Sequence, residues 1–305
     1  MSLRQGPEWT PDGRVWFAQA LRGPACLLVV FAHFGHIFLF EQATVGAVAL
    51  FPPLSGLPRP PWASVIEVLD RLHVSTGHVG VFVFFLVSGF VIPYSLADRR
   101  LGGFFVRRFF RLYPALWACL AVTVTVLVVH LDFLGYALPY DAAAVAGDAL
   151  LVSPYLGSRW IEPVLWTLAV EELFYLVAAL VAWRGRLADG RVVAVVAGFL
   201  TAVALVAGTE QRPETARFWV GFNATFVLFI LIGLVVHQRF RGRWGLGAST
   251  AGAALLAACY AVALYRGPAA PQATVYLVSS AVGASAFAAL YLLRRRLRYL
   301  RTLDM

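Results

Sequence analysis

Long apolar stretches dominate this chain, with short polar or arginine-bearing segments between them. A helix needs about 20 predominantly apolar residues to cross the hydrocarbon core of a bilayer. Stretches of that kind predict an all-α, polytopic transmembrane helix bundle of about eight spans, of which the shortest are expected to be tilted or re-entrant. The predicted spans lie near residues 18–40, 78–97, 113–130, 164–183, 192–208, 218–236, 246–265 and 273–293.

Composition agrees with lipid as the main solvent of the chain. Of 305 residues, 60% are hydrophobic and 13% are charged, whereas an ordinary soluble domain is about 25% charged. No segment between the spans is long enough to bury a core of its own. We therefore expect residues 1–305 to form a single membrane domain, with the lipid bilayer as one partner.

The basic residues are all arginine, and their number does not indicate a nucleic-acid partner. Arginine in place of lysine, together with abundant alanine, valine and glycine, is typical of a GC-rich bacterial genome. Most arginines fall at the N-terminus, at the C-terminus and in every second connection between the predicted spans, and therefore on one face of the membrane. Under the positive-inside rule this face is cytoplasmic, which places both termini in the cytoplasm. The first apolar stretch is too long for a signal-peptide core and is expected to be retained. The sequence thus predicts a multi-pass protein of the bacterial plasma membrane.

Few ionisable residues lie inside the predicted spans, and each suggests a function because a charge there costs at least ~2.5 kcal/mol. Arg22 and His33 share one face of the first span, about 16 Å apart along its axis. His33 lies about 10 Å from the outer end of that span. Glu171 lies at a similar depth, about 12 Å beyond Pro163 in the fourth span. A carboxylate beside an imidazole can fix its tautomer and make it a general base.

Simpler interpretations of these residues stay open. An intramembrane histidine can simply hydrogen-bond a backbone carbonyl and have no catalytic role. Glu172 can face a loop or a polar cavity. His36, one turn after His33, is expected to be structural or solvated. The three cysteines lie inside predicted spans without metal-ligand spacing, so we predict neither a metal site nor a disulfide framework.

The first arginine-rich loop offers a second candidate site. Arg107, Arg108 and Arg111 have the i,i+3 and i,i+4 spacing of one helical surface, and planar guanidinium groups suit phosphate. Arginines on this side of a membrane protein also set its topology and contact anionic lipid headgroups. Both explanations fit the loop.

Four segments together resemble the acyltransferase-3 family of integral membrane O-acyltransferases. Their order and spacing over residues 18–176 carry the resemblance, whereas residues 177–305 match only as further helices. The segments are Ala20-Leu21-Arg22-Gly23 leading to Phe31-Ala32-His33-Phe34, then Gly80 to Ile92, then Arg107-Arg108-Phe109-Phe110-Arg111-Leu112-Tyr113-Pro114, and Trp166-Thr167-Leu168-Ala169-Val170-Glu171-Glu172-Leu173-Phe174-Tyr175.

The resemblance implies an enzyme that takes an acyl group, most simply acetyl, from cytoplasmic acyl-CoA. It implies that Arg108 and Arg111 hold the donor phosphates and that Arg22 helps hold the donor. His33 would remove the acceptor proton or carry the acyl group, Glu171 would orient the imidazole, and Ser88 would line the pore. No bound cofactor is implied beyond the donor, and the acceptor would be a hydroxyl of a glycan, glycolipid or lipid-linked carbohydrate.

Two departures from the family pattern accompany the resemblance. Gln19-Ala20 stands where the family usually has Asp-Gly, so the partner of Arg22 is open. The family also usually continues beyond a segment like Leu300-Arg301, so the chain is expected to lack the last spans of the family. A transporter or flippase for a surface-glycan precursor or small anion is the main alternative function, and a degenerate member with a scaffolding role is a third.

Overall fold

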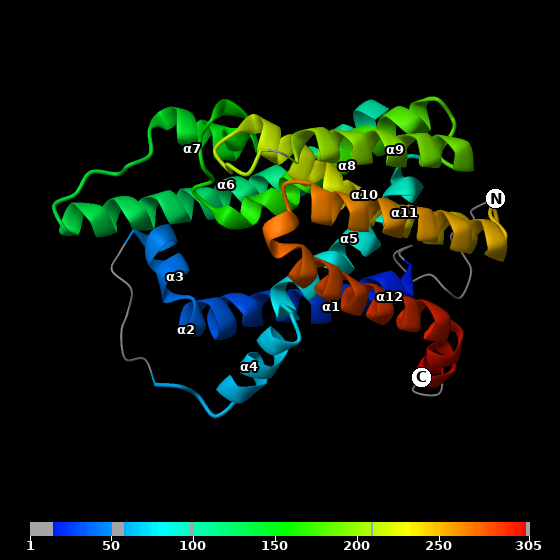
Figure 1. Cartoon of the computed structure of the whole chain (residues 1–305), viewed down its shortest axis with the longest axis horizontal. Helices are drawn as coiled ribbons and strands as arrows, with labels where there is room; N and C mark the ends of the chain where they lie inside the picture. Colours follow the sequence, from blue (N-terminus) through cyan, green and yellow to red (C-terminus); the bar gives the residue numbers. More distant parts are fainter. Residues whose placement is uncertain (1–14, 51–57, 98–100, 209, 303–305) are drawn as a thin grey trace.

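The protein is built from helices joined by short connections (Figure 1). The computed structural model describes residues 15–50, 58–97, 101–208 and 210–302, with side chains described as far as residue 294. Within these ranges, eight helices are long and apolar enough to cross a membrane. The predicted all-α bundle and its eight spans are confirmed.

The eight spans follow one another with short irregular pieces at some of their ends. The first span, Trp16–Phe40, contains α1 (Trp16–Phe31), a π-helical segment and α2 (Phe38–Phe40). The others are α5 (Thr76–Ser95), α6 (Leu101–Phe133), α8 (Trp166–Trp183) after the 3-10 turn Pro163–Leu165, α9 (Gly190–Ala207), α10 (Ala216–Phe240), α11 (Leu246–Arg266) and α12 (Ala273–Thr302) after the 3-10 turn Ala270–Gln272.

The largest difference from the predicted boundaries concerns α6. Hydropathy places its start near residue 113, but the helix begins at Leu101 and includes the arginine-rich segment. Arginine is a good helix former, so the helix continues past the apolar window into a charged turn. The predicted shared surface of Arg107, Arg108 and Arg111 is therefore the first part of a transmembrane helix rather than a loop.

Two connections are longer than the others and contain short helices. The connection after the first span has α3 (Gln42–Ala49) and α4 (Ala63–Arg71), while α7 (Ala142–Ala149) and the 3-10 helix Ser153–Leu156 lie between α6 and α8. The connection after the first span also has several prolines between residues 51 and 61, of which residues 51–57 lie outside the described residues. In Figure 1, α3 and α7 lie toward the left, opposite the end where α11 begins, and α4 lies at the lower edge below α1.

Helices α5 and α10 form the centre of the bundle and are its most buried spans. They cross where two glycines meet. A Cβ atom at Gly89 would lie 2.0 Å from the carbonyl oxygen of Ile230, and one at Gly233 would lie 2.3 Å from the carbonyl oxygen of Leu86. In a membrane, small residues allow this direct backbone contact, which replaces the hydrophobic driving force that lipid does not supply.

Helix α5 also contacts the first and last spans through small residues. A Cβ atom at Gly80 would lie 2.5 Å from the carbonyl oxygen of Ala25 in α1, and Gly283 of α12 faces the carbonyl oxygen of Val79 at 3.2 Å by the same measure. Helix α5 is therefore the element that aligns α1, α10 and α12.

Replacing Gly89 by alanine should lower the stability of the bundle, because the added methyl group overlaps the α10 backbone. We expect a loss of about 1–3 kcal/mol, the usual cost of overpacking, measured as a lower thermal unfolding temperature in detergent. Gly198→Ala on α9 is the matched control, since no atom lies within 4 Å of its added Cβ. Equal unfolding temperatures for the two variants would contradict the close α5–α10 contact.

Candidate active site

The first span leaves α geometry at the turn that carries His33. Residues Ala32–Ile37 form a π-helix between α1 and α2. Such wide turns are rare and are frequently found at functional sites. The segment is held against the start of α5, where a Cβ atom at Gly77 would lie 2.9 Å from Cβ of Ala32. The side chain of His33 is left largely uncovered by protein.

A backbone carbonyl fixes the tautomer of His33. Nδ1 of the imidazole lies 2.7 Å from the carbonyl oxygen of Val29. A carbonyl oxygen can only accept, so Nδ1 carries the proton and donates it. In the neutral imidazole this leaves the lone pair on Nε2, which can accept a proton from a ligand.

Arg22 finds its side-chain partner on its own helix. Its Nη1 donates to Oε1 of Gln19 at 2.9 Å. Gln19 is the residue that departs from the family pattern, so an amide oxygen stands where an aspartate is usual. The guanidinium of Arg22 is thereby oriented from within its own helix.

Glu171 of α8 faces α5 rather than the first span. The hydroxyl of Ser88 donates to Oε1 of Glu171 at 2.6 Å, a short distance that is typical of a bond to a charged acceptor. Both side chains are half-buried. Gly89 contacts the backbone of α10 at the same turn. In the Ser88-Gly89 pair, the glycine therefore packs against α10 and the serine makes the polar contact with α8.

Arg108 is the arginine of α6 that turns into the bundle. Its Nη2 donates to the hydroxyl of Ser95 at 2.9 Å, and its guanidinium lies 5.5 Å from the ring centre of Phe104 and 5.4 Å from that of Tyr175. Arg107 and Arg111 remain exposed. The predicted phosphate-binding pair, Arg108 and Arg111, thus consists of one anchored and one free guanidinium.

Glu172 projects from α8 toward α6, about 100° around the helix axis from Glu171. The hydroxyl of Tyr113 on α6 donates to Oε1 of Glu172 at 2.6 Å. The two groups line a pocket of about 240 Å³ between α6 and α8, together with Phe105, Arg108, Phe109, Leu112, Tyr175 and Leu176. Glu172 therefore faces a partly polar cavity, one of the two settings left open by the sequence.

The structure joins some of the predicted site residues and leaves others apart. Ser88 meets Glu171 directly, and Arg108 lies beside Tyr175, one turn from Glu171. Across the described ranges, no hydrogen bond or ion pair joins His33 to Glu171, so their catalytic pairing stays a prediction. Tyr113 and Ser95 were not singled out from the sequence, although Tyr113 stands in the arginine segment quoted above.

His36 has a structural environment, in keeping with its expected role. Its Nε2 lies 3.4 Å from Oδ2 of Asp70 in α4 and 3.9 Å from Oε1 of Glu41. These contacts tie the π-helical segment to the helices that follow it. Within the described part of the chain, no group of three or more His, Cys, Asp and Glu residues is placed to hold a metal ion.

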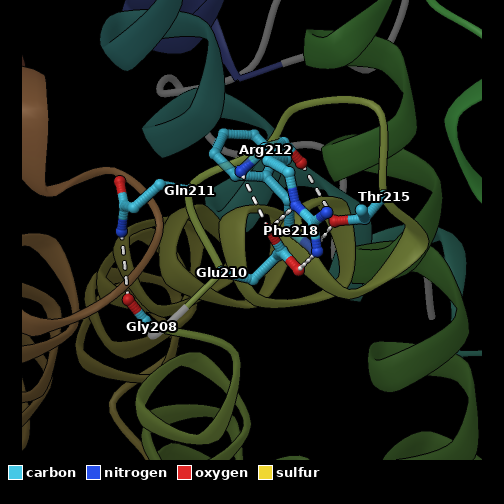
Figure 2. Close-up of polar contacts among 6 residues, drawn as sticks. All are labelled: Gly208, Glu210, Gln211, Arg212, Thr215 and Phe218. Atoms are coloured by element: carbon cyan, nitrogen blue, oxygen red, sulfur yellow. Dashed lines mark hydrogen bonds and ion pairs between the residues drawn. The ribbon is translucent and has the colours of Figure 1, made fainter.

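Polar contacts also order the connection between α9 and α10. The guanidinium of Arg212 pairs with the carboxylate of Glu210, and Gln211 donates to the carbonyl oxygen of Gly208 (Figure 2). The hydrogen bonds from Arg212 lower the pKa of Glu210 to about 2. Glu214 pairs with Arg159 at 2.5 Å, which links this connection to the segment before α8.

A buried carboxylate holds the other connection at this end. Oδ2 of Asp148 in α7 accepts from the backbone N–H of Ile161 at 2.9 Å. Burial raises the pKa of Asp148 above its usual range, against the effect of these hydrogen bonds. Side-chain contacts therefore hold both the connection between α9 and α10 and the segment between α7 and α8 in place.

Among the described residues, eight helices able to cross a membrane indicate a multi-pass membrane protein, and acid, hydroxyl and guanidinium groups meet between them. The chain belongs to the acyltransferase-3 family, whose sequence profile, described as an acyltransferase domain, matches residues 15–303. Members of this family are enzymes that transfer acyl groups, and the family expected from the sequence motifs is confirmed.

Three curated bacterial proteins are similar to parts of the chain. Nodulation protein 10 of Rhizobium leguminosarum is 35% identical over 136 residues, 39% of this chain and 37% of that protein. Acyltransferase MdmB of Streptomyces mycarofaciens is 29% identical over 221 residues, which cover 63% of this chain and 54% of that protein. The peptidoglycan O-acetyltransferase OatA of Listeria monocytogenes is 31% identical over 150 residues, which cover 41% of this chain and 23% of that protein.

The matched region spans about half or less of the length of each of these relatives. No solved structure is significantly similar to the chain.

Replacing Tyr113 by phenylalanine should destabilise the α6–α8 contact, because Glu172 loses its hydrogen-bond donor. We expect a loss of roughly 1 kcal/mol, the usual net value for such a bond when it is partly exposed. Thermal unfolding in detergent measures the effect, with Tyr136→Phe on an exposed side chain as the control. If both variants unfold at the temperature of the unaltered chain, the Tyr113–Glu172 bond contributes nothing to the fold.

Proposed function

We propose that this protein is a membrane-bound O-acyltransferase that moves an acyl group, most simply acetyl, from cytoplasmic acyl-CoA to a hydroxyl group of a glycan, glycolipid or similar acceptor. The observation that carries the proposal is the state of His33. Its Nδ1 proton is committed to the Val29 carbonyl oxygen, and its Nε2 is left as a base on an uncovered wide turn.

His33 is the proposed general base of the transfer. Nε2 takes the proton of the acceptor hydroxyl while the hydroxyl oxygen forms its bond to the acyl carbon. The carbon–sulfur bond of the thioester then breaks, and the leaving sulfur takes the proton from the imidazolium. His33 ends neutral, with Nδ1 still bonded to Val29. The Val29 bond also stabilises the positive charge of the intermediate imidazolium.

Arg108 and Arg111 are the proposed phosphate contacts of the donor. The exposed guanidinium of Arg111 can reach a ligand at the arginine-rich end of the bundle, while Arg108 is already held by Ser95 and Tyr175. Planar guanidinium groups make two parallel hydrogen bonds to phosphate. Arg22, oriented by Gln19, is proposed to contact the donor deeper in the bundle.

Glu171 and Ser88 are proposed to line the reaction chamber between the two substrates. Their short bond holds a half-buried carboxylate that also interacts electrostatically with Arg108. A negative charge in such a position favours a neighbouring imidazolium. Glu171 is thereby proposed to act on His33 through the charge that develops during the reaction.

The acceptor class rests on the relatives. One relative is named a peptidoglycan O-acetyltransferase and another an acyltransferase, so a hydroxyl-bearing glycan is the first acceptor to test. All three relatives are bacterial. We accordingly propose the bacterial plasma membrane as the location, with both termini and the donor site on the cytoplasmic side.

Replacing His33 by alanine should lower CoA release from acetyl-CoA at least 100-fold, since general-base catalysis contributes about 10²–10⁴-fold. Purified protein is assayed with a panel of hydroxyl-bearing glycans. His36→Ala is the matched control, because it lies in the same π-helix and contacts Asp70 instead. Equal turnover by the His33 variant and the unaltered chain would exclude His33 as the base, and glycan transport without CoA release would exclude acyl transfer.

A further inference from the structure

The pocket between α6 and α8 is a narrow slot that runs along the helices. Its lining on α6 extends from Phe105 to Tyr113, a distance of about 12 Å at 1.5 Å per residue. With a volume of about 240 Å³, it holds about eight groups of the size of a water molecule, taken as ~30 Å³ each. A cleft lined along about two turns of α6 can take an unbranched chain laid along the helix.

The walls of the slot suit a hydrocarbon chain. Phe109 stacks on Tyr113 with their ring centres 4.7 Å apart. Tyr113 donates to Oε1 of Glu172, so the wall combines these aromatic faces with one hydrogen-bonded polar pair. At the rim, Phe105, Phe109 and Leu176 are 37%, 39% and 58% exposed. Since these apolar side chains lie within transmembrane helices, the mouth of the slot opens toward lipid.

The slot is continuous with the polar cluster of the candidate active site. Arg108 lines the slot and bonds Ser95, while Tyr175 lines the slot and faces Arg108. On α8, Glu172 borders the slot, and Glu171, which bonds Ser88, also interacts with Tyr175 of the slot lining. A carbonyl group held beside Ser88 and Glu171 could therefore extend an attached chain past Tyr175 into the slot, while the donor phosphates lie toward the arginine-rich end of α6.

We infer that the slot binds the hydrocarbon chain of the donor's acyl group, so that this protein accepts acyl groups longer than acetyl, up to about eight carbons within the slot. This inference rests on the proposed use of acyl-CoA as donor. Leu176 at the rim is the residue that sets the space available to the chain. An indole in its place would occupy the slot and leave room for only a short acyl group.

Acyl-CoA binding tests the inference without knowledge of the acceptor. Purified protein in detergent is titrated calorimetrically with acetyl-CoA and octanoyl-CoA. We expect octanoyl-CoA to bind at least tenfold more tightly, because burial of a longer chain removes apolar surface from water. In the Leu176→Trp variant this advantage should fall to about twofold or less, while the affinity for acetyl-CoA stays within about twofold.

Leu180→Trp is the matched control. Leu180 lies one turn further along α8, is also 58% exposed, and does not line the slot. It receives the same new side chain, and detergent contributes equally to both variants, so the control should keep the octanoyl advantage. Loss of the advantage in both variants, or in neither, would overturn the slot as the chain site.

The inference and the proposed function fail in different ways. If the unaltered chain binds acetyl-CoA but gains nothing from the octanoyl chain, the slot inference is wrong and the donor assignment stands. If the unaltered chain binds neither thioester, the proposed donor is wrong and the slot inference falls with it.

Discussion

The structure depends on the close approach of α5 to its neighbours. Lipid supplies no hydrophobic force between helices, so packing must come from direct contact. Helix α5 achieves this with glycines that face backbone atoms of α1 and α10. Its remaining partly exposed face carries Ser88 and Ser95 toward α8 and α6. The same helix therefore fixes the bundle and supplies the hydroxyl groups of the candidate site.

A second constraint is that each polar group inside the membrane needs a partner within the protein. The adjacent carboxylates of Glu171 and Glu172 meet this need on two different helices, at Ser88 and at Tyr113. Like charges next to each other disfavour the ionised forms, and a separate hydrogen-bond donor for each carboxylate offsets part of that cost. This arrangement also gives α8 two polar faces, one toward the proposed reaction chamber and one toward the slot.

The fold was largely predictable from the sequence, because the length of an apolar stretch is decided by the thickness of the bilayer. The candidate site was predictable by residue type and depth but less by partner. His33 was expected beside an acid, yet its described bond goes to Val29, since a π-helix forms where apolar periodicity alone predicts a regular helix. Likewise, the start of α6 and the bond of Tyr113 depend on how helices pack, which spacing along one chain does not encode.

The proposed reaction couples His33 and Glu171, which no hydrogen bond joins within the described residues. A double-mutant cycle on kcat/KM for acetyl transfer, with His33→Ala, Glu171→Gln and both together, measures whether they act on one reaction centre. If Glu171 acts through the imidazole, the double variant should be no slower than the His33 variant alone. Losses that multiply in the double variant would contradict a shared centre.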